Sequence, residues 1–363
     1  MVKLCVLADA DSIHTRKWID YFSELNYEIH LISMRKTHYR YSDNVKIYIL
    51  KPPFNNKLSY FLLINKVKNI INKVKPDILH GHYATSYGML GKMSGFHPFI
   101  VSAWGSDIYE FPNRNKLNEK MLKSILNSAD AVCSTSNNMS LEMKKYYDGD
   151  IIITPFGVDL SKFKQTDSIL NKDYITIGVA KNLKPIYGIN YLIEAFSEVK
   201  NELKHLKFRL LIIGDGSERT KLEKLCEEKG VSSIVEFTGN IDNDKIPEYI
   251  NLMDIVCIPS LSESFGVAAV EACACGRPVI ASNVGGLKEI VINGYNGYLV
   301  KAADVNDIKE KIKLILSDRD KLIEFSNNAR LFVEDNYNWS NNREIMKKLY
   351  DKFTNNKLCV NEN

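Results

Sequence analysis

The sequence predicts an α/β protein with two doubly wound domains, each a parallel sheet covered by helices. Short apolar, β-branched runs alternate with amphipathic helical patterns along all 363 residues, which is typical of parallel strands joined by crossover helices. The chain is also longer than one core usually supports, which favours two domains. Residues 160–173 are polar and aperiodic, and we place the linker there.

In the first half, the apolar β-branched runs predict strands. They lie near residues 2–8, 28–33, 45–49, 77–80, 98–103, 130–133 and 151–154. Apolar residues that recur every three or four positions predict the helices between them. These lie near residues 13–25, 58–75, 84–94, 116–128 and 137–146.

The second half repeats the alternation. Its strands are expected near residues 174–180, 208–213, 234–238, 254–258, 278–281 and 298–300. Its helices are expected near residues 188–202, 217–229, 245–251, 265–275, 286–292 and 304–316. Residues 319–353 have helical periodicity without an obvious strand. We therefore expect one Rossmann-like domain over 1–165, a second over 166–340, and a C-terminal helix over 341–363 that packs back on the first domain.

Composition narrows the class of protein. Hydrophobic residues make up 45% and charged residues 25%, as in ordinary globular proteins, and no apolar run reaches the length of a membrane span. Without a signal peptide, the chain is expected in the cytoplasm. The seven cysteines are odd in number and form no C-x-x-C pair, so we expect buried thiols rather than disulfides or a metal site.

Charge is distributed unevenly along the chain. Residues 1–165 hold 22 Lys and Arg against 15 Asp and Glu, a net charge of +7, whereas residues 166–363 hold 26 against 29. A basic first half fits an anionic membrane surface or a phosphorylated acceptor, but it equally fits a solvated lysine-rich face. Nucleic acid is the weakest alternative, because the excess is small and no nucleic-acid motif is present.

The segment over residues 259–278 contains the strongest functional signal. An apolar strand runs into a loop with Ser260 and Glu263, and that loop opens an Ala- and Val-rich helix. The N–H groups at Phe265, Gly266 and Val267 would then point at a diphosphate. Glu271, one turn further on, is costly to bury unless it accepts hydrogen bonds, for which ribose hydroxyls are suitable donors. Taken singly, a first-turn Glu often only complements the dipole and a mid-helix Glu usually faces water.

Two Glu seven residues apart, with Phe-Gly after the first and Gly-Arg-Pro-Val after the helix, resemble the donor site of retaining glycosyltransferases of family 4, which have the GT-B fold. Other segments match this family in the same order, over 155–159, 211–216, 235–239, 284–289 and 293–297. The GT-B fold would place two Rossmann-like domains across a cleft, and the resemblance implies that the domain over 1–165 binds the acceptor and the domain over 166–340 binds the nucleotide-sugar donor.

The resemblance implies roles for individual residues. Glu263 would bind the transferred sugar, Glu271 the ribose, and Gly239 would lie beside the base. Gly157, in the segment 155–159, is placed in the donor site on the same basis. The family needs no bound metal, since the helix dipole and basic side chains stabilise the departing diphosphate. We therefore expect neither cofactor nor metal site.

The basic side chains depart from the family pattern. The family has an Arg after a strand and then a Lys before a Gly, whereas here Lys181 and Tyr187 stand at those positions. Lys184 is a candidate to compensate from within the loop. A solvated loop lysine is the alternative for both cations.

The first half offers candidates that follow strands. His14 and Arg16 come after the first strand, in a loop that lacks the Gly-x-Gly-x-x-Gly pattern of dinucleotide sites. Many relatives have a sugar-contacting His where Trp104 stands, so His82 or Asp107 is a candidate to replace it. A lone His at a strand end is, however, more often structural.

The helix beginning at Leu58 places its apolar residues largely on one stripe, at Leu58, Phe61, Leu62, Val67, Ile70, Ile71 and Val74. Its lysines lie mostly elsewhere. This pattern describes a helix that rests on anionic lipid or one that covers a sheet, and the second is commoner.

The sequence therefore predicts a retaining glycosyltransferase that moves a sugar from a nucleotide sugar, with UDP favoured, to a saccharide or lipid-linked acceptor. Surface polysaccharide or cell envelope synthesis is the expected setting. The alternatives are a non-catalytic nucleotide-sugar binding protein and a related epimerase or phosphorylase.

Overall fold

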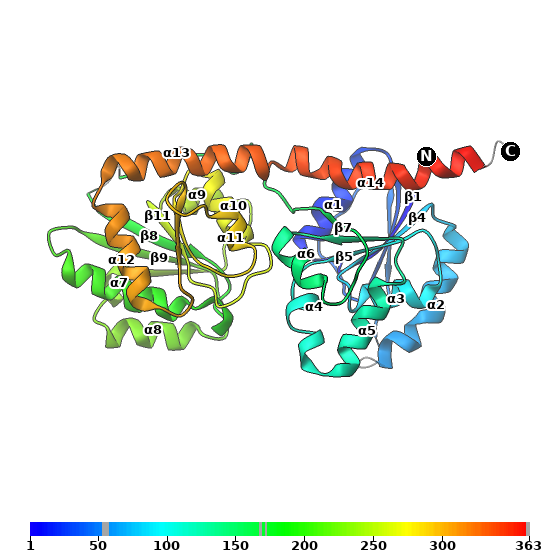
Figure 1. The fold of residues 1–363 in the computed structure, drawn as a ribbon, viewed down its shortest axis with the longest axis horizontal. Coiled ribbons are helices and arrows are strands. Elements are labelled where there is room, and N and C mark those ends of the chain that lie inside the picture. Colours follow the sequence, from blue (N-terminus) through cyan, green and yellow to red (C-terminus); the bar gives the residue numbers. More distant parts are fainter. Residues whose placement is uncertain (53–57, 167–168, 171–172, 361–363) are drawn as a thin grey trace. The chain divides into compact units, whose positions relative to one another are not determined.

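The computed structural model describes residues 1–52, 58–166, 169–170 and 173–360. The chain forms two compact units (Figure 1). The first comprises Met1–Phe156 together with Asn341–Asn363, and the second comprises Gly157–Ser340.

The first unit is built on a seven-stranded sheet of order β3-β2-β1-β4-β5-β6-β7. All neighbouring strands are parallel. The strands are β1 (Lys3–Leu7), β2 (Glu28–Ser33), β3 (Val45–Ile49), β4 (Ile78–His82), β5 (Phe99–Ala103), β6 (Ala131–Ser134) and β7 (Ile151–Ile153). The inner strands of this sheet are almost wholly buried, as expected when helices cover both faces of a parallel sheet.

The helices of the first unit are α1 (Ile13–Glu24), α2 (Leu58–Val74), α3 (Tyr87–Ser94), α4 (Ser106–Tyr109), α5 (Lys116–Leu126) and α6 (Asn137–Met143), with a 3₁₀ turn over Pro112–Arg114. Asn115 and Ser136 cap α5 and α6 by accepting backbone N–H bonds. The single turn α4 was not predicted, because four residues show no apolar period.

The second unit has a six-stranded parallel sheet of order β10-β9-β8-β11-β12-β13. Its strands are β8 (Ile175–Ala180), β9 (Phe208–Ile213), β10 (Val235–Gly239), β11 (Ile255–Ile258), β12 (Val279–Ser282) and β13 (Gly297–Val300). The main helices are α7 (Ile189–Glu202), α8 (Arg219–Glu228), α9 (Ile246–Asn251), α10 (Val267–Ala274), α11 (Leu287–Ile290), α12 (Val305–Leu316) and α13 (Arg319–Asn336). The predicted fold class, two doubly wound Rossmann-like domains, is confirmed.

The unit boundary lies earlier than the linker placed over 160–173. Residues just after Phe156 already bond within the second unit, where Arg330 donates to the Phe163 carbonyl at 2.7 Å and the Thr166 N–H donates to Asn251 at 3.1 Å. Residues 167–168 and 171–172 of the predicted linker lie outside the described part of the chain.

The predicted C-terminal helical tail forms two helices, α13 and α14 (Trp339–Val360), separated by Tyr337 and Asn338. From Asn341 onward the chain belongs to the first unit. There Tyr350 is buried, with its ring centroid 4.6 Å from that of Phe22.

One expectation about side chains changes. On α2, Val67, Ile71 and Val74 face the core as predicted, but Phe61 and Leu62 are 57% and 56% exposed, and the side chain of Leu58 lies outside the described set. The expected buried thiols are confirmed for six cysteines, which are free and buried. The side chain of Cys359 lies outside the described set. No helix of the described residues is long and apolar enough to cross a membrane.

Candidate functional site

The strand order of the second unit reverses between β8 and β11. From this pair the sheet grows outward in opposite directions, through β9 on one side and β12 on the other. Ligands of doubly wound sheets bind beyond the carboxyl ends of the strands at such a switch point. The segments that follow the two strands are residues 181–188 and 259–266.

Lys181 and Glu263, one on each segment, form an ion pair. Nζ of Lys181 lies 2.5 Å from Oε2 of Glu263, and the side chains are only 13% and 11% exposed. The Lys181 ammonium also lies 4.7 Å from the centroid of the Tyr187 ring, and the Ser260 hydroxyl donates to Glu263 at 3.5 Å. The structure therefore brings together Lys181, Glu263 and Ser260, three of the predicted site residues.

The Glu263 loop packs closely against the loop that follows β12. A Cβ on Gly285 would lie 1.6 Å from the Glu263 carbonyl oxygen, and one on Gly286 would lie 2.4 Å from that of Phe265. The Gly286 N–H donates to the Glu263 carbonyl at 3.1 Å. Larger side chains would push the two loops apart, so these glycines hold Glu263 in position.

Helix α10 begins directly after this loop. Its N-cap, Gly266, has a φ of +102° and supplies no side-chain capping bond. The first N–H groups of the helix, beginning at Val267, have no partner within the helix and carry the positive end of its dipole. Phe265 is buried with its ring centroid 5.6 Å from that of Tyr337, so it can offer a ligand only its backbone.

Glu271 lies on the second turn of α10. It is half-buried, whereas its neighbours Val270 and Ala272 are buried. A carboxylate at the margin of an otherwise apolar helix is accessible to hydroxyl donors.

Three other predicted residues occupy different positions. Lys184 is exposed and precedes the 3₁₀ turn Pro185–Tyr187. Gly239 ends β10 with a φ of +73°, and Gly157 has a φ of +62°. Their roles continue to depend on the family resemblance.

In the first unit, four rings gather near the carboxyl ends of β4 and β5. His14 stacks on Phe156 with centroids 3.9 Å apart, and Trp104 lies 5.9 Å and 5.5 Å from these two rings. His82 joins them at 4.9 Å from Trp104. Burial lowers the pKa of His14 to about 4 and that of His82 to about 3, so both rings are neutral near pH 7. Nδ1 of His82 has no hydrogen-bond partner in the described part of the chain.

Asp107 takes a different position from the one expected of a substrate-facing group. It is fully buried, and its carboxylate accepts N–H bonds from Ala84 at 2.8 Å and Gly105 at 2.7 Å. Burial raises its pKa, although these bonds oppose the shift. Asp107 joins the loops after β4 and β5, and we assign it a positioning role.

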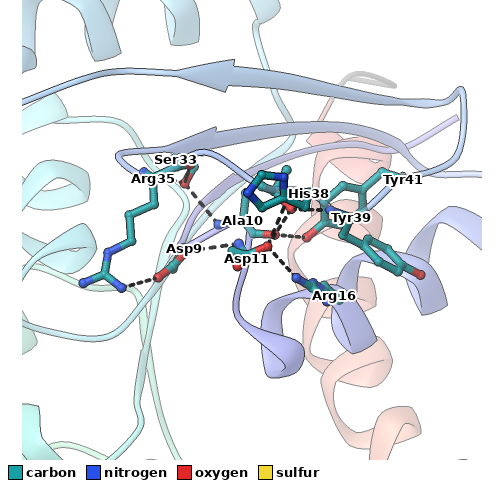
Figure 2. A network of polar contacts seen from close by, with 10 residues as sticks. Asp9, Ala10, Asp11, Arg16, Ser33, Arg35, His38, Tyr39 and Tyr41 are labelled. Atoms are coloured by element: carbon teal, nitrogen blue, oxygen red, sulfur yellow. Dashed lines mark hydrogen bonds and ion pairs between the residues drawn. The ribbon is translucent and has the colours of Figure 1, made fainter. Parts of the chain in front are cut away.

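The loops after β1 and β2 form a charged network (Figure 2). The Asp11 carboxylate lies 2.5 Å from Arg16, and it accepts from the Thr37 hydroxyl at 3.1 Å. Asp9 pairs with Arg35 at 3.3 Å. Arg16 also lies over the Tyr39 ring, at 4.8 Å. Arg16, a candidate ligand contact by sequence, is thus already engaged by Asp11 and Tyr39.

Sequence reasoning missed two contributors. Phe156 lies within a matched segment, but nothing in the spacing showed that its ring would cover His14. Tyr187 was noted only as a missing lysine, whereas its ring face contacts the Lys181 ammonium. Lys181 and Tyr187 are six residues apart around a turn, and this spacing of a cation and an aromatic residue could have indicated the contact.

Family models match both units. "Glycosyl transferases group 1" matches residues 161–332, which include the ion pair and α10, and "Glycosyl transferase 4-like" matches residues 3–136. The chain belongs to the group 1 glycosyltransferases. It is therefore a glycosyltransferase enzyme, and its fold is GT-B.

The chain is also similar to individual glycosyltransferase sequences and to solved structures of the same fold. An uncharacterised glycosyltransferase of Methanocaldococcus jannaschii is 29% identical over 82% of each chain. A D-inositol 3-phosphate glycosyltransferase of Catenulispora acidiphila is 28% identical over 70% of this chain and 65% of its own. Sucrose-phosphate synthase of Thermosynechococcus elongatus has a TM-score of 0.87 at 23% identity, covering 98% of this chain and 99% of its own. Anabaena HepE with UDP-glucose has a TM-score of 0.79 at 19% identity, covering 96% and 99%.

Proposed function

We propose that this glycosyltransferase transfers a sugar from a UDP-sugar to a saccharide or lipid-linked acceptor with retention of anomeric configuration. The observation that carries the proposal is the Lys181–Glu263 pair beside the N-terminus of α10, at the switch point of the second sheet. A solved structure of similar fold, Anabaena HepE, is a complex with UDP-glucose, which supports UDP as the nucleotide.

In the proposed complex the donor diphosphate lies at the start of α10. The N–H groups of Gly266 and Val267 would donate to its oxygens, and the Lys181 ammonium would balance the charge that develops there. The Glu263 carboxylate would accept from hydroxyls of the transferred sugar. Glu271 would accept from the ribose. No metal is required in this scheme, because the helix and Lys181 supply the positive charge.

We propose retention on the basis of the family resemblance. Since no carboxylate is assigned as a nucleophile, a front-face displacement is proposed rather than a glycosyl-enzyme. The bond from the anomeric carbon to the diphosphate oxygen breaks while the acceptor oxygen bonds on the same face. The acceptor proton passes to the departing diphosphate.

The first unit is proposed to bind the acceptor. Its neutral rings His14, Trp104 and His82 would contact sugar, since an unpaired Nδ1 on His82 offers a hydrogen bond to a hydroxyl. Synthesis of surface polysaccharide or another envelope component, at the cytoplasmic side of the membrane, is the proposed setting. Exposed Phe61 and Leu62 on α2 support peripheral membrane contact.

The central test measures turnover and UDP binding separately. Glu263→Ala and Glu271→Ala should each lower kcat/KM by about 100-fold or more, as loss of a transition-state contact does. Because UDP carries ribose but no transferred sugar, Glu271→Ala should weaken UDP binding about tenfold, whereas Glu263→Ala should not weaken it. Calorimetry with UDP and an assay for released nucleotide supply both values.

Glu248→Ala, which removes an exposed carboxylate of the same unit, is the matched control. Near-normal turnover in both site variants would refute the assignment. Tight UDP-sugar binding without any nucleotide release would favour the non-catalytic protein, a requirement for inorganic phosphate would favour a phosphorylase, and sugar conversion without release would favour an epimerase. Full activity in EDTA is expected.

A further inference from the structure

The first unit contains a polar cavity, of about 300 Å³, beyond the carboxyl ends of β4 and β5. The loop after β4 and the start of α4 form its polar side, and α2, α5 and the 3₁₀ turn Pro112–Arg114 complete it. α3 packs against α2 and α5 (Figure 1). Its lining residues are Tyr60, Tyr83, Thr85, Ser86, Ser106, Phe111, Arg114 and Met121.

The lining is rich in hydroxyl groups. Five of the eight side chains end in a hydroxyl, and Phe111 and Met121 supply apolar surface. Ser86 precedes α3 yet makes no side-chain capping bond, so its hydroxyl is not used by the helix. Hydroxyls that both donate and accept, beside an aromatic or thioether wall, suit a polyhydroxylated ligand.

Among the described residues that line the cavity, Arg114 is the one charged side chain and none is a carboxylate. Its guanidinium lies 3.5 Å from Glu110, and the two side chains are 65% and 50% exposed. A guanidinium has five N–H donors, so this weak pair leaves most of them for an anion. The charge of Arg114 therefore favours a ligand that carries phosphate or carboxylate.

The backbone around Tyr83 is held in an unusual conformation. Tyr83 has a φ of +79°, which costs energy for a residue with a side chain. Its hydroxyl bonds to that of Ser106, and burial raises its pKa to about 12, so the phenol stays protonated. Strain that persists at a strand end, beside His82, is typical of functional sites.

We propose that this cavity is the subsite for an anionic group on a hydroxylated acceptor, such as a sugar phosphate or polyol phosphate, with Arg114 holding the anion and Tyr83 and Ser86 the hydroxyls. The inference deepens the proposed function, since it names the acceptor class. A relative that acts on D-inositol 3-phosphate is consistent with such an acceptor.

The test uses the full chain and saturation-transfer NMR with glucose 6-phosphate, inositol phosphate and their unphosphorylated parents. Phosphorylated probes should bind more tightly than the parents. Arg114→Gln should raise their Kd about tenfold or more and leave the parents unaffected, whereas Ser86→Ala should weaken both classes. Vesicles with and without phosphatidylinositol form a second arm, which distinguishes a lipid headgroup from a soluble phosphate.

Arg319→Gln, an exposed arginine of the second unit, is the matched control. Since Arg114 is 65% exposed, its variant should keep the wild-type melting temperature. If no probe in either arm depends on Arg114, or if Arg319→Gln has the same effect, the proposal is overturned. UDP affinity, measured on the same samples, should be unchanged. Failure of the wild type to bind UDP would count against the donor site and not against this cavity.

Discussion

Lys181 and Glu263 are 82 positions apart in the chain, yet they form the most buried ion pair of the candidate site. A pair with about a tenth of its surface exposed is weakly hydrated, so removal of either partner leaves a charge without compensation. For the same reason, water screens the Lys181 ammonium little, so its attraction to a diphosphate would be strong. The Tyr187 ring also contacts the ammonium, with its centroid 4.7 Å away.

Substitution of Lys181 tests this arrangement. Lys181→Met should lower kcat/KM about 10- to 100-fold, because a hydrogen bond to a charged group contributes about 1.5–3 kcal/mol. Lys181→Arg should retain most activity, since it keeps the charge. Steady-state kinetics measures the loss of turnover in each variant, and calorimetry measures its effect on UDP binding. Tyr187→Phe, which keeps the ring face, is the control, and equal activity of the Met and Arg variants would contradict the proposed role.

At the scale of elements, the strands and most helices could be predicted because each has an apolar period that burial enforces. The ends of α10 and the loop that precedes it, residues 259–266, were also predictable, because Gly266, Glu263 and Glu271 lie within nine residues of one another in the sequence. The pairing of Lys181 with Glu263 was not, because it depends on β8 and β11 being neighbours. Likewise, sequence alone makes Asp107 a candidate to replace the sugar-contacting His, and only the structure shows its bond to the loop after β4.

Helix α2 also shows what a sequence pattern alone cannot predict, and its exposed residues lead to a testable prediction. Its period predicts a buried stripe, but a period alone does not say whether Phe61 and Leu62 fall inside it, and both are exposed. If these side chains enter a bilayer, the double variant Phe61→Ser, Leu62→Ser should reduce flotation with anionic liposomes several-fold, because each buried apolar side chain contributes about 1.5–3 kcal/mol.

Neutral liposomes should bind less of the wild-type chain, since Lys66 and Lys68 on the same helix are also exposed. Leu331→Ser, at an exposed leucine of the second unit, is the control. Flotation that is absent, or equal in all variants, would remove the membrane proposal.

At the scale of the whole molecule, the chain returns to its first unit after completing the second. The residues that complete the first core therefore include Tyr350, which is 270 positions beyond His80. The Tyr350 hydroxyl lies 2.6 Å from His80 Nδ1, and His80 Nε2 lies 2.8 Å from Ser102. Burial keeps the pKa of His80 low, so a neutral ring with one N–H serves both bonds.

Because α14 completes the core of the first unit, substitution of Tyr350 should destabilise that unit and leave the second unit unaffected. Tyr350→Ala should destabilise the first unit by about 3–5 kcal/mol, as removal of a buried aromatic does, and Tyr350→Phe by about 1–3 kcal/mol, because His80 Nδ1 loses its partner. Hydrogen exchange followed by mass spectrometry should show faster exchange in β1, β4 and α1, with α7 and β9 unchanged. Lys348→Ala, an exposed neighbour on α14, should alter neither set. Equal loss of protection in both units would mean that they unfold together, and the C-terminal segment would then stabilise the molecule as one cooperative body.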